Sequence, residues 1–225
     1  MIISHQYRFI FIKTAKTAGT SVEIALSKFC GPDDVITPIS PKDEATRREL
    51  GYRGAQNFRI PLRHYGARDF AKALYSRKPL AFYHHAPASF IREYVDADVW
   101  NSYFKFTIER NPFDKAISWY YWVNHGERSL EEFILAGGTN YASKFDLYAI
   151  DGEIVVDEVY RYEQMDAAMA DLQQRLGLPE APELPHAKVG TRKDPRNYRE
   201  VLTPAARRKI EQVCARELAY HGYTW

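Results

Sequence analysis

The sequence predicts an α/β fold in which helices flank a central, mostly parallel sheet. Short runs rich in aromatic and β-branched residues at 7–12, 80–84 and 103–108 predict three strands, the first of the kind buried on both faces. A helical pattern follows each run, which is the order of a βαβ unit. The length of 225 residues, with 45% hydrophobic and 27% charged residues, fits one globular domain, 1–225.

The elements of the N-terminal half follow this order. The loop after the first strand leads into a predicted helix over 20–28. Prolines and glycines interrupt 31–62, which predicts an irregular or partly helical insertion. Helices with a proline in the first turn are predicted over 87–95, after the second strand, and from 112 to 123, after the third.

The C-terminal half contains a hairpin signal and two helices. Asp151-Gly152 between apolar runs predicts a hairpin over 149–155, and a strand is expected to continue to Tyr162. Amphipathic helices are predicted over 164–176 and 204–220. A loop rich in proline, lysine and arginine, 184–198, lies between them.

Composition narrows the function classes. A net charge of +2 is too small to imply a nucleic-acid partner. Cys30 and Cys214 are far apart and have no metal or redox spacing, so a reducing compartment is the simpler interpretation. The apolar run near the N-terminus is far shorter than the ~20 residues of a membrane helix. We therefore expect a cytoplasmic protein without a transmembrane segment.

The loop of residues 13–21, KTAKTAGTS, has the features of an anion site. A loop between a strand and a helix presents free backbone N–H groups at the positive end of the helix dipole. Gly19 permits close approach, and Lys16 adds a mobile charge. The lysine precedes the glycine, whereas the Walker spacing GxxxxGKS/T has the reverse order, which argues against an ordinary ATPase or GTPase. The alternative is a polar turn with a solvated lysine and a capped helix.

Arg110 and Ser118 form a candidate second anion site. Arg110 lies at the predicted C-terminal end of the third strand, the edge where open parallel sheets bind ligands. Ser118 lies about two turns into the next helix, where a serine contributes little to helix stability. The alternative is an arginine paired with Glu109 or Asp114 and an exposed serine.

The two motifs together resemble those of PAPS-dependent sulfotransferases, particularly the carbohydrate type. Residues 9–21 resemble the 5′-phosphosulfate loop with its PKTGGTS-like signature, although Ala15 stands where proline is frequent. Residues 109–118, ERNPFDKAIS, resemble the 3′-phosphate motif, and 161–163 and 220–223 also resemble this family.

This resemblance implies a three-layer, P-loop NTPase-like fold that binds PAPS and releases PAP. It implies that 31–80 lies on the acceptor side and that the basic loop 184–198 closes over the nucleotide, unless that loop is simply solvated. The residues implied in cofactor binding are Lys16, Thr17, Ala18, Gly19, Thr20 and Ser21 for the 5′ end, and Arg110, Ser118, Arg192 and Lys193 for the 3′-phosphate.

The implied reaction moves a sulfuryl group to a hydroxyl or amine of a carbohydrate, lipid or small metabolite. Lys16 would neutralise charge on the leaving phosphate, and a histidine is the natural base near neutral pH. The motif His85-Ala86-Pro87 favours His85 over His84, since at most one of two neighbours on a continuing strand faces the donor. The alternatives are two structural histidines or, with no third ligand evident, a metal pair. No acidic metal cluster is visible, so no metal is expected.

Two other function classes stay open from the sequence. One is a P-loop kinase of a small molecule, against which the missing Walker order and magnesium-binding acid speak. The other is a non-catalytic module that binds PAP or another nucleotide. The aromatic residues of 119–122 are interpreted as core residues more than adenine-stacking residues, although one could do both; they are Trp119, Tyr120, Tyr121 and Trp122. Within 63–68, Arg63, His64, Tyr65 and Arg68 are a candidate lining of the acceptor pocket. The acceptor and the oligomeric state are not predicted.

Overall fold

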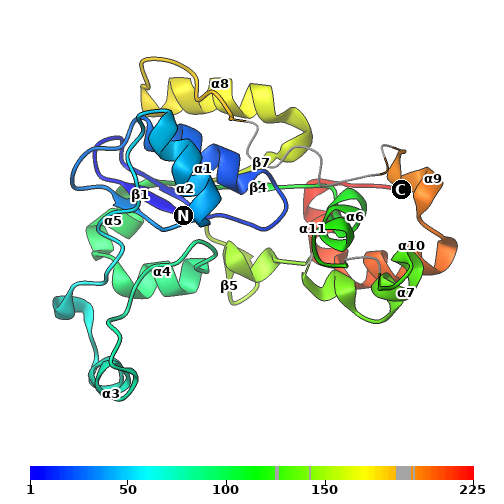
Figure 1. Ribbon diagram of the computed structural model, residues 1–225, viewed down its shortest axis with the longest axis horizontal. Coiled ribbons are helices and arrows are strands. Elements are labelled where there is room, and N and C mark those ends of the chain that lie inside the picture. Colours follow the sequence, from blue (N-terminus) through cyan, green and yellow to red (C-terminus); the bar gives the residue numbers. More distant parts are fainter. Residues whose placement is uncertain (125–126, 142, 186–193, 195) are drawn as a thin grey trace.

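The computed structural model describes residues 1–124, 127–141, 143–185, 194 and 196–225, and in these residues a mixed five-stranded sheet forms the centre (Figure 1). The strand order is β3-β1-β2-β4-β7. The strands are β1 (Ile2–Ser4), β2 (Phe9–Phe11), β3 (Val35–Ile36), β4 (Phe104–Glu109) and β7 (Glu158–Arg161). β2, β4 and β7 run parallel, whereas β1 is antiparallel to both of its neighbours. The α/β prediction is confirmed, but the sheet is mixed rather than mostly parallel, because two of its four strand pairings are antiparallel.

Helices cover both faces of the sheet because the strand side chains alternate. Phe9 and Phe11 share a core with α1 (Gly19–Ser27) and α8 (Met165–Leu176). Ile10 and Ile12 belong to the opposite core, with α4 (Ala88–Tyr94) and α5 (Ala97–Ser102). This is the period of two that a pleated strand imposes. The first strand is therefore buried on both faces, as predicted.

A third core lies beyond the C-terminal ends of β4 and β7, among helices on the right of Figure 1. Its helices are α6 (Pro112–Val123), α7 (Leu130–Leu135), α9 (Tyr198–Val201), α10 (Pro204–Val213) and α11 (Ala215–His221). α6 starts directly after β4, because Asn111 Oδ1 accepts from Phe113 N at 3.0 Å and Pro112 occupies the first turn. The predicted helix over 112–123 is confirmed, and the one over 204–220 is interrupted at Cys214.

The segment between α1 and β4 is the most irregular part of the chain. Within 31–62 it contains α2 (Pro41–Glu49), so the partly helical prediction is confirmed, and α3 (Ala67–Ser76) follows. The predicted strand over 80–84 is wrong. Ile60 N donates to Leu80 O at 2.9 Å and Phe82 N to Phe58 O at 2.8 Å, and a turn follows in which Ala86 N donates to Tyr83 O at 3.0 Å. Pro79 and this turn leave room for one isolated bridge only.

The remaining predictions concern the C-terminal half. The hairpin is confirmed as β5 (Ala149–Ile150) and β6 (Glu153–Ile154), and Asp151 and Gly152 both have positive φ, as such a turn requires. The strand expected up to Tyr162 is shorter, and α8 agrees with its prediction. Much of the basic loop 184–198, including Arg192 and Lys193, lies outside the described residues. Short 3-10 turns occur at Leu62–His64, Gly138–Tyr141, Phe145–Leu147 and Tyr162–Gln164.

A fully buried carboxylate ties the first strands to α1. Glu23 of α1 accepts hydrogen bonds from Lys13 Nζ at 2.7 Å and Thr37 Oγ1 at 3.0 Å, and it pairs with the Met1 ammonium at 2.9 Å. Burial by itself raises the pKa of Glu23, but the two cations outweigh burial and hold its pKa below the ordinary value. The carboxylate is therefore charged and compensated inside the protein.

Replacing Glu23 by Gln should destabilise the fold strongly. The side chain keeps its shape but loses the charge that compensates buried Lys13, so we expect a loss of about 3–5 kcal/mol in the free energy of unfolding. Urea titration measures this loss. The control is Glu211→Gln, because Glu211 pairs with Arg207 at 2.7 Å and both side chains are more than a third exposed. The free energy of unfolding should fall clearly less in the control than in Glu23→Gln. Similar losses in both variants would contradict the central role of Glu23.

Candidate functional site

The loop between β2 and α1 has an unusual backbone. Lys16 and Ala18 both have positive φ, +63° and +56°, although neither is a glycine, and Thr17 between them does not. Such alternation makes successive N–H groups converge on a concave nest that binds anions. Non-glycine residues in this region store strain, which is typical of functional sites.

The first turn of α1 adds donors to this nest. Ala18 occupies the cap position and no side chain caps the helix there, so the N–H groups of the first turn are available to a ligand. The helix dipole favours an anion at this end. Gly19 allows the loop to fold closely on itself, because a Cβ at this position would come within 2.8 Å of Lys13 Cγ and 3.3 Å of Thr14 O.

Two threonine side chains stabilise the loop and connect it to β4. The Thr14 hydroxyl donates to the Ile108 carbonyl of β4 and lies 3.0 Å from the Thr17 hydroxyl. Thr17 Oγ1 also contacts Thr14 O at 3.2 Å and is fully buried. The hydroxyl of Thr17 thus supports the loop, and only its backbone N–H remains a candidate ligand contact.

A cleft of about 490 Å³ opens in front of this loop. Its volume is in the range of small-molecule sites. From the predicted set it is lined by Lys16, Ala18, Gly19, Thr20, Ser21 and His85, and further by Lys13, Thr14, Ala15, Pro38, Ile39, Ser40, Asp43, His84, Trp119 and Trp122. The structure therefore brings the loop and both histidines together. The segment 63–68 is not part of this lining.

Two tryptophans of α6 form part of the cleft wall, contrary to their interpretation as core residues. Trp119 and Trp122 are three residues apart and so share a helix face. Lys16 Nζ lies 4.5 Å from the centroid of the Trp122 ring, a cation–π distance. The i, i+3 spacing of the tryptophans was a usable signal. Ser40 and Asp43, from the insertion, had no such signal.

His85 is fixed by the backbone of the same loop. His85 Nδ1 lies 2.8 Å from Lys13 O, and because a carbonyl only accepts, Nδ1 carries the proton and Nε2 is left as an acceptor. Burial lowers the pKa of His85 to about 4, despite the opposing effect of this hydrogen bond. At neutral pH the ring is uncharged and can accept a proton at Nε2.

His84 also lines the cleft, with its ring centroid 4.5 Å from that of His85. The sequence expectation that only one of them faces the donor depended on a strand. Because both residues follow the turn at Tyr83 instead, both reach the cleft.

Arg110 lies beside the loop rather than in the cleft. Its Nε donates to Asp114 Oδ2 at 2.9 Å, its Nη1 donates to Lys16 O at 3.3 Å, and its guanidinium stacks 4.2 Å from the centroid of the Tyr162 ring. The pairing with Asp114 is the one that the sequence offered as an alternative. Ser118 lies one turn beyond Asp114, on the same side of α6. Arg110 therefore contacts the loop, and Ser118 lies on the side of α6 that carries the partner of Arg110, Asp114.

Neither a cluster of metal-binding side chains nor a membrane-spanning helix occurs among the described residues. No group of three or more His, Cys, Asp or Glu side chains is arranged to hold a metal ion in this part of the chain. Within the same residues, no helix has the length and apolar character needed to cross a membrane.

The state of His85 is directly testable. At pH 7, nitrogen NMR should show a neutral ring protonated at Nδ1, with a pKa near 4 instead of 6.5. Since the folded state stays neutral while the unfolded chain takes up a proton, the free energy of unfolding should fall between pH 6.5 and 4. His85→Asn should reduce that pH dependence, whereas His5→Gln, at an exposed position, should not. A pKa near 6.5 or a proton on Nε2 would contradict the assignment.

Comparison with known proteins gives little beyond the geometry. No family model matches the chain, and no solved structure matches it. A curated protein of Archaeoglobus fulgidus, described as an uncharacterized protein, is 28% identical over 123 residues. The match covers 52% of this chain and 99% of that protein. The chain is thus similar to a protein whose description states no activity.

Proposed function

We propose that this protein is a PAPS-dependent sulfotransferase acting on a hydroxyl or amine of a carbohydrate, lipid or small-metabolite acceptor. One observation carries the proposal: a strained anion-binding loop and a neutral His85 line the same cleft. The P-loop NTPase-like arrangement is part of the proposal, and it is supported by helices on both faces of the parallel strands β2, β4 and β7.

The residues fit the 5′ end of the cofactor well. The nest at Lys16 and Ala18 and the first turn of α1 supply N–H donors, and the hydroxyls of Thr20 and Ser21 line the same cleft. Lys16 supplies the positive charge. Its contact with Trp122 is on the side of the cleft, so a bound anion would compete with the ring for the ammonium group.

The 3′-phosphate is assigned to Arg110 and Ser118. Asp114 orients the guanidinium, and the contact with Lys16 O keeps it against the loop. A phosphate here would share Arg110 with Asp114, since the guanidinium has five donors. Arg192 and Lys193 remain candidates for the same phosphate, outside the described residues.

The chemistry needs a base and a stabilised leaving group. PAPS would supply a sulfuryl group already bonded to a phosphate that can leave. His85 Nε2 accepts the proton of the acceptor as the new bond to sulfur forms. The loop N–H groups and Lys16 stabilise the charge left on the phosphate oxygen when its bond to sulfur breaks. Holding both groups on one cleft supplies the in-line positioning that this transfer requires.

Nucleotide preference separates the proposed reaction from a kinase. Calorimetric titration should show binding of PAP in the absence of magnesium, with little change when magnesium is added and little affinity for ATP. The reason is that the loop lacks the Walker order and the proposed second site recognises a 3′-phosphate. Binding of ATP with magnesium in preference to PAP would contradict the proposal and favour a small-molecule kinase.

Two substitutions separate catalysis from cofactor binding. His85→Ala should lower kcat by about 10² or more and leave the affinity for PAP unchanged, because it removes the base only. Arg110→Ala should weaken PAP binding about tenfold or more, because it removes a charged contact to phosphate. Turnover is followed with labelled PAPS across an acceptor panel, and PAP affinity by calorimetry.

Matched controls exist for both variants. His84→Ala tests the neighbouring histidine and should keep turnover. Arg207→Ala removes an arginine that makes a comparable i, i+4 pair, with Glu211, remote from the loop, and should keep PAP affinity. Normal turnover in His85→Ala refutes the base. PAP binding without turnover of any acceptor would indicate the non-catalytic module.

A further inference from the structure

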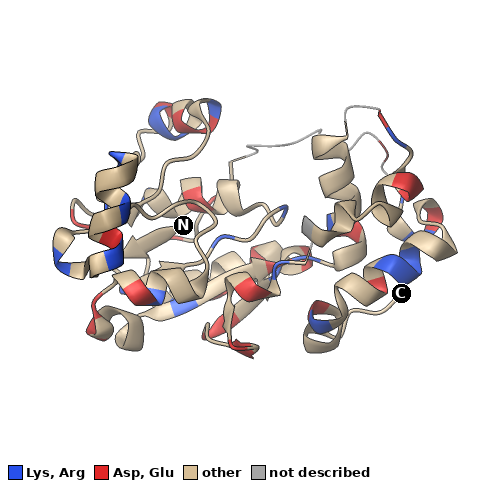
Figure 2. Cartoon of the chain, turned by 90° about the horizontal axis from the view of Figure 1, so that it is seen from below, with Lys and Arg blue, Asp and Glu red and all other residues tan. Residues whose placement is uncertain are grey.

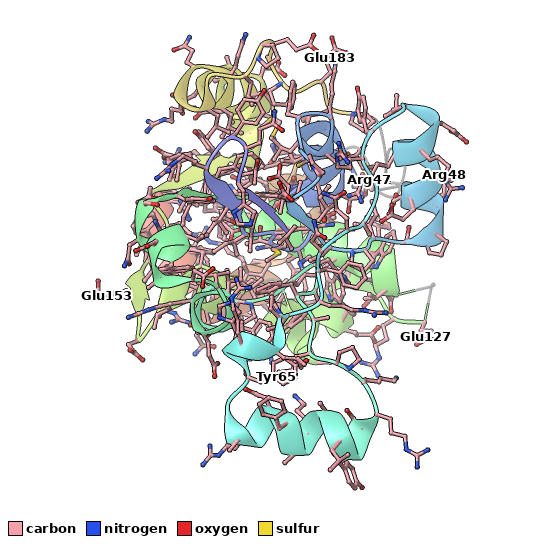
Figure 3. All side chains as sticks on the ribbon, turned by 90° about the vertical axis from the view of Figure 1, so that its left-hand side faces the viewer. Arg47, Arg48, Tyr65, Glu127, Glu153 and Glu183 are labelled. Atoms are coloured by element: carbon pink, nitrogen blue, oxygen red, sulfur yellow. The ribbon has the colours of Figure 1, made fainter. Side chains whose placement is uncertain are left out.

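We propose that residues 62–78, here called the α3 arm, dock on an anionic lipid bilayer. The arm consists of the turn at Leu62–His64, helix α3 (Ala67–Ser76) and the two residues that follow it. It stands away from the body of the molecule in two perpendicular views (Figures 1 and 3). This inference is independent of the proposed enzymatic function.

The apolar side of the arm faces outward. Leu74 is 83% exposed, Tyr75 95%, Leu62 66% and Phe70 51%. Phe70 and Leu74 are four residues apart, so they lie on one face of α3. No residue of this helix is buried. Large apolar side chains grouped at the surface mark an interaction site.

The acidic residue of the helix, Asp69, contacts the body of the molecule. Asp69 Oδ1 accepts a hydrogen bond from Tyr94 Oη of α4 at 2.9 Å. Tyr65 lies at the base of the arm, where its hydroxyl accepts from Leu80 N at 2.6 Å (Figure 3). A surface helix normally buries its apolar face and exposes its polar one. α3 instead exposes its apolar residues together with its basic ones and buries neither, so its orientation does not serve the packing of the core.

The charge of the arm indicates what kind of surface it binds. It carries five basic residues and one acidic residue, a surplus of +4 in a chain whose total is +2; the basic residues are Arg63, Arg68, Lys72, Arg77 and Lys78. Figure 2 shows lysines and arginines distributed along this part of the chain. Basic residues beside exposed leucine, phenylalanine and tyrosine are the composition of helices that lie in the interface of anionic membranes. Tyrosine also suits that boundary, since its ring is apolar and its hydroxyl polar.

A second copy of the chain fits the arm poorly. Contact between the arms of two chains would bring together two segments that each carry a surplus charge of +4. A helix of ten residues also offers much less than the ~800 Å² per partner of a standard protein interface. A bilayer needs no such area from one helix, because apolar insertion and electrostatic attraction act together.

Co-sedimentation of the full chain with lipid vesicles tests the inference. Binding to phosphatidylcholine vesicles that contain about 30% phosphatidylserine should exceed binding to pure phosphatidylcholine about tenfold or more, and should weaken as salt is raised. The double variant Leu74→Ser/Tyr75→Ser should lose about tenfold in affinity. Lys72→Ser/Lys78→Ser should lose the preference for phosphatidylserine.

Unfolding should not be the cause of a loss of vesicle binding, because Leu74 and Tyr75 are exposed. The double variant should therefore keep the wild-type melting temperature. The control Leu135→Ser changes a leucine on α7 that is 48% exposed and should bind as the wild type does. The inference is overturned if the wild type ignores phosphatidylserine, or if Leu74→Ser/Tyr75→Ser binds normally. It is also overturned if the wild type binds no vesicles at all. This holds even if sedimentation shows self-association that Leu74→Ser/Tyr75→Ser abolishes.

Discussion

The buried contact between Lys13 and Glu23 supports both the fold and the candidate chemistry. The side chain of Lys13 donates to Glu23 at 2.7 Å, and the carbonyl of Lys13 accepts a hydrogen bond from His85 Nδ1 at 2.8 Å. One residue thus links the middle of α1 to His85. Because a carbonyl cannot donate, the orientation of Lys13 decides which nitrogen of His85 is free.

A second pair of ionic contacts fixes the other side of the site. At the end of β4, Glu109 is buried and pairs with Lys115 at 2.6 Å, whereas the next residue, Arg110, turns outward to Asp114. The last residue of β4 and the residue that follows it thus pair with two neighbouring residues in the first turns of α6. Burial raises the pKa of Glu109, although the charge of Lys115 acts in the opposite direction. Keeping this carboxylate charged inside the protein therefore carries a desolvation cost. The contact between Glu109 and Lys115 fixes the end of β4, where Arg110 lies against the carbonyl of Lys16.

The sequence predicted the parts of this site that depend on local patterns. A buried apolar run, small polar residues and a helix pattern sufficed to place the loop of residues 13–21, and a strand followed by Asn111-Pro112 placed Arg110. The positive φ of Lys16 and Ala18 could not be predicted, because neither is a glycine and the strain is imposed by the surrounding contacts. The strands β1 and β3 are only three and two residues long and give no periodic signal.

The error at 80–84 had a different cause. The residues have strand composition, but strand propensity expresses packing on a pleated, half-buried surface, and this segment finds only one partner. Tyr83 is exposed, whereas Phe82 is buried, so the run is anchored by a single side chain. The far wall of the cleft, with Ser40 and Asp43, depends on how the insertion folds back over α1. Such contacts between remote segments are not encoded in any short window.

The insertion links the cleft to the α3 arm. α2 contributes Asp43 to the cleft, the arm follows, and the chain then returns through Leu80 and Phe82 to His84 and His85. Both ends of the arm are fastened at its base, because residues 58–60 pair with residues 80–82 and Tyr65 holds Leu80. A surface bound to the exposed face of α3 would therefore lie in a defined direction from His85. If the acceptor of the proposed transfer is a lipid, the same insertion would hold the bilayer and complete the cleft that receives the head group.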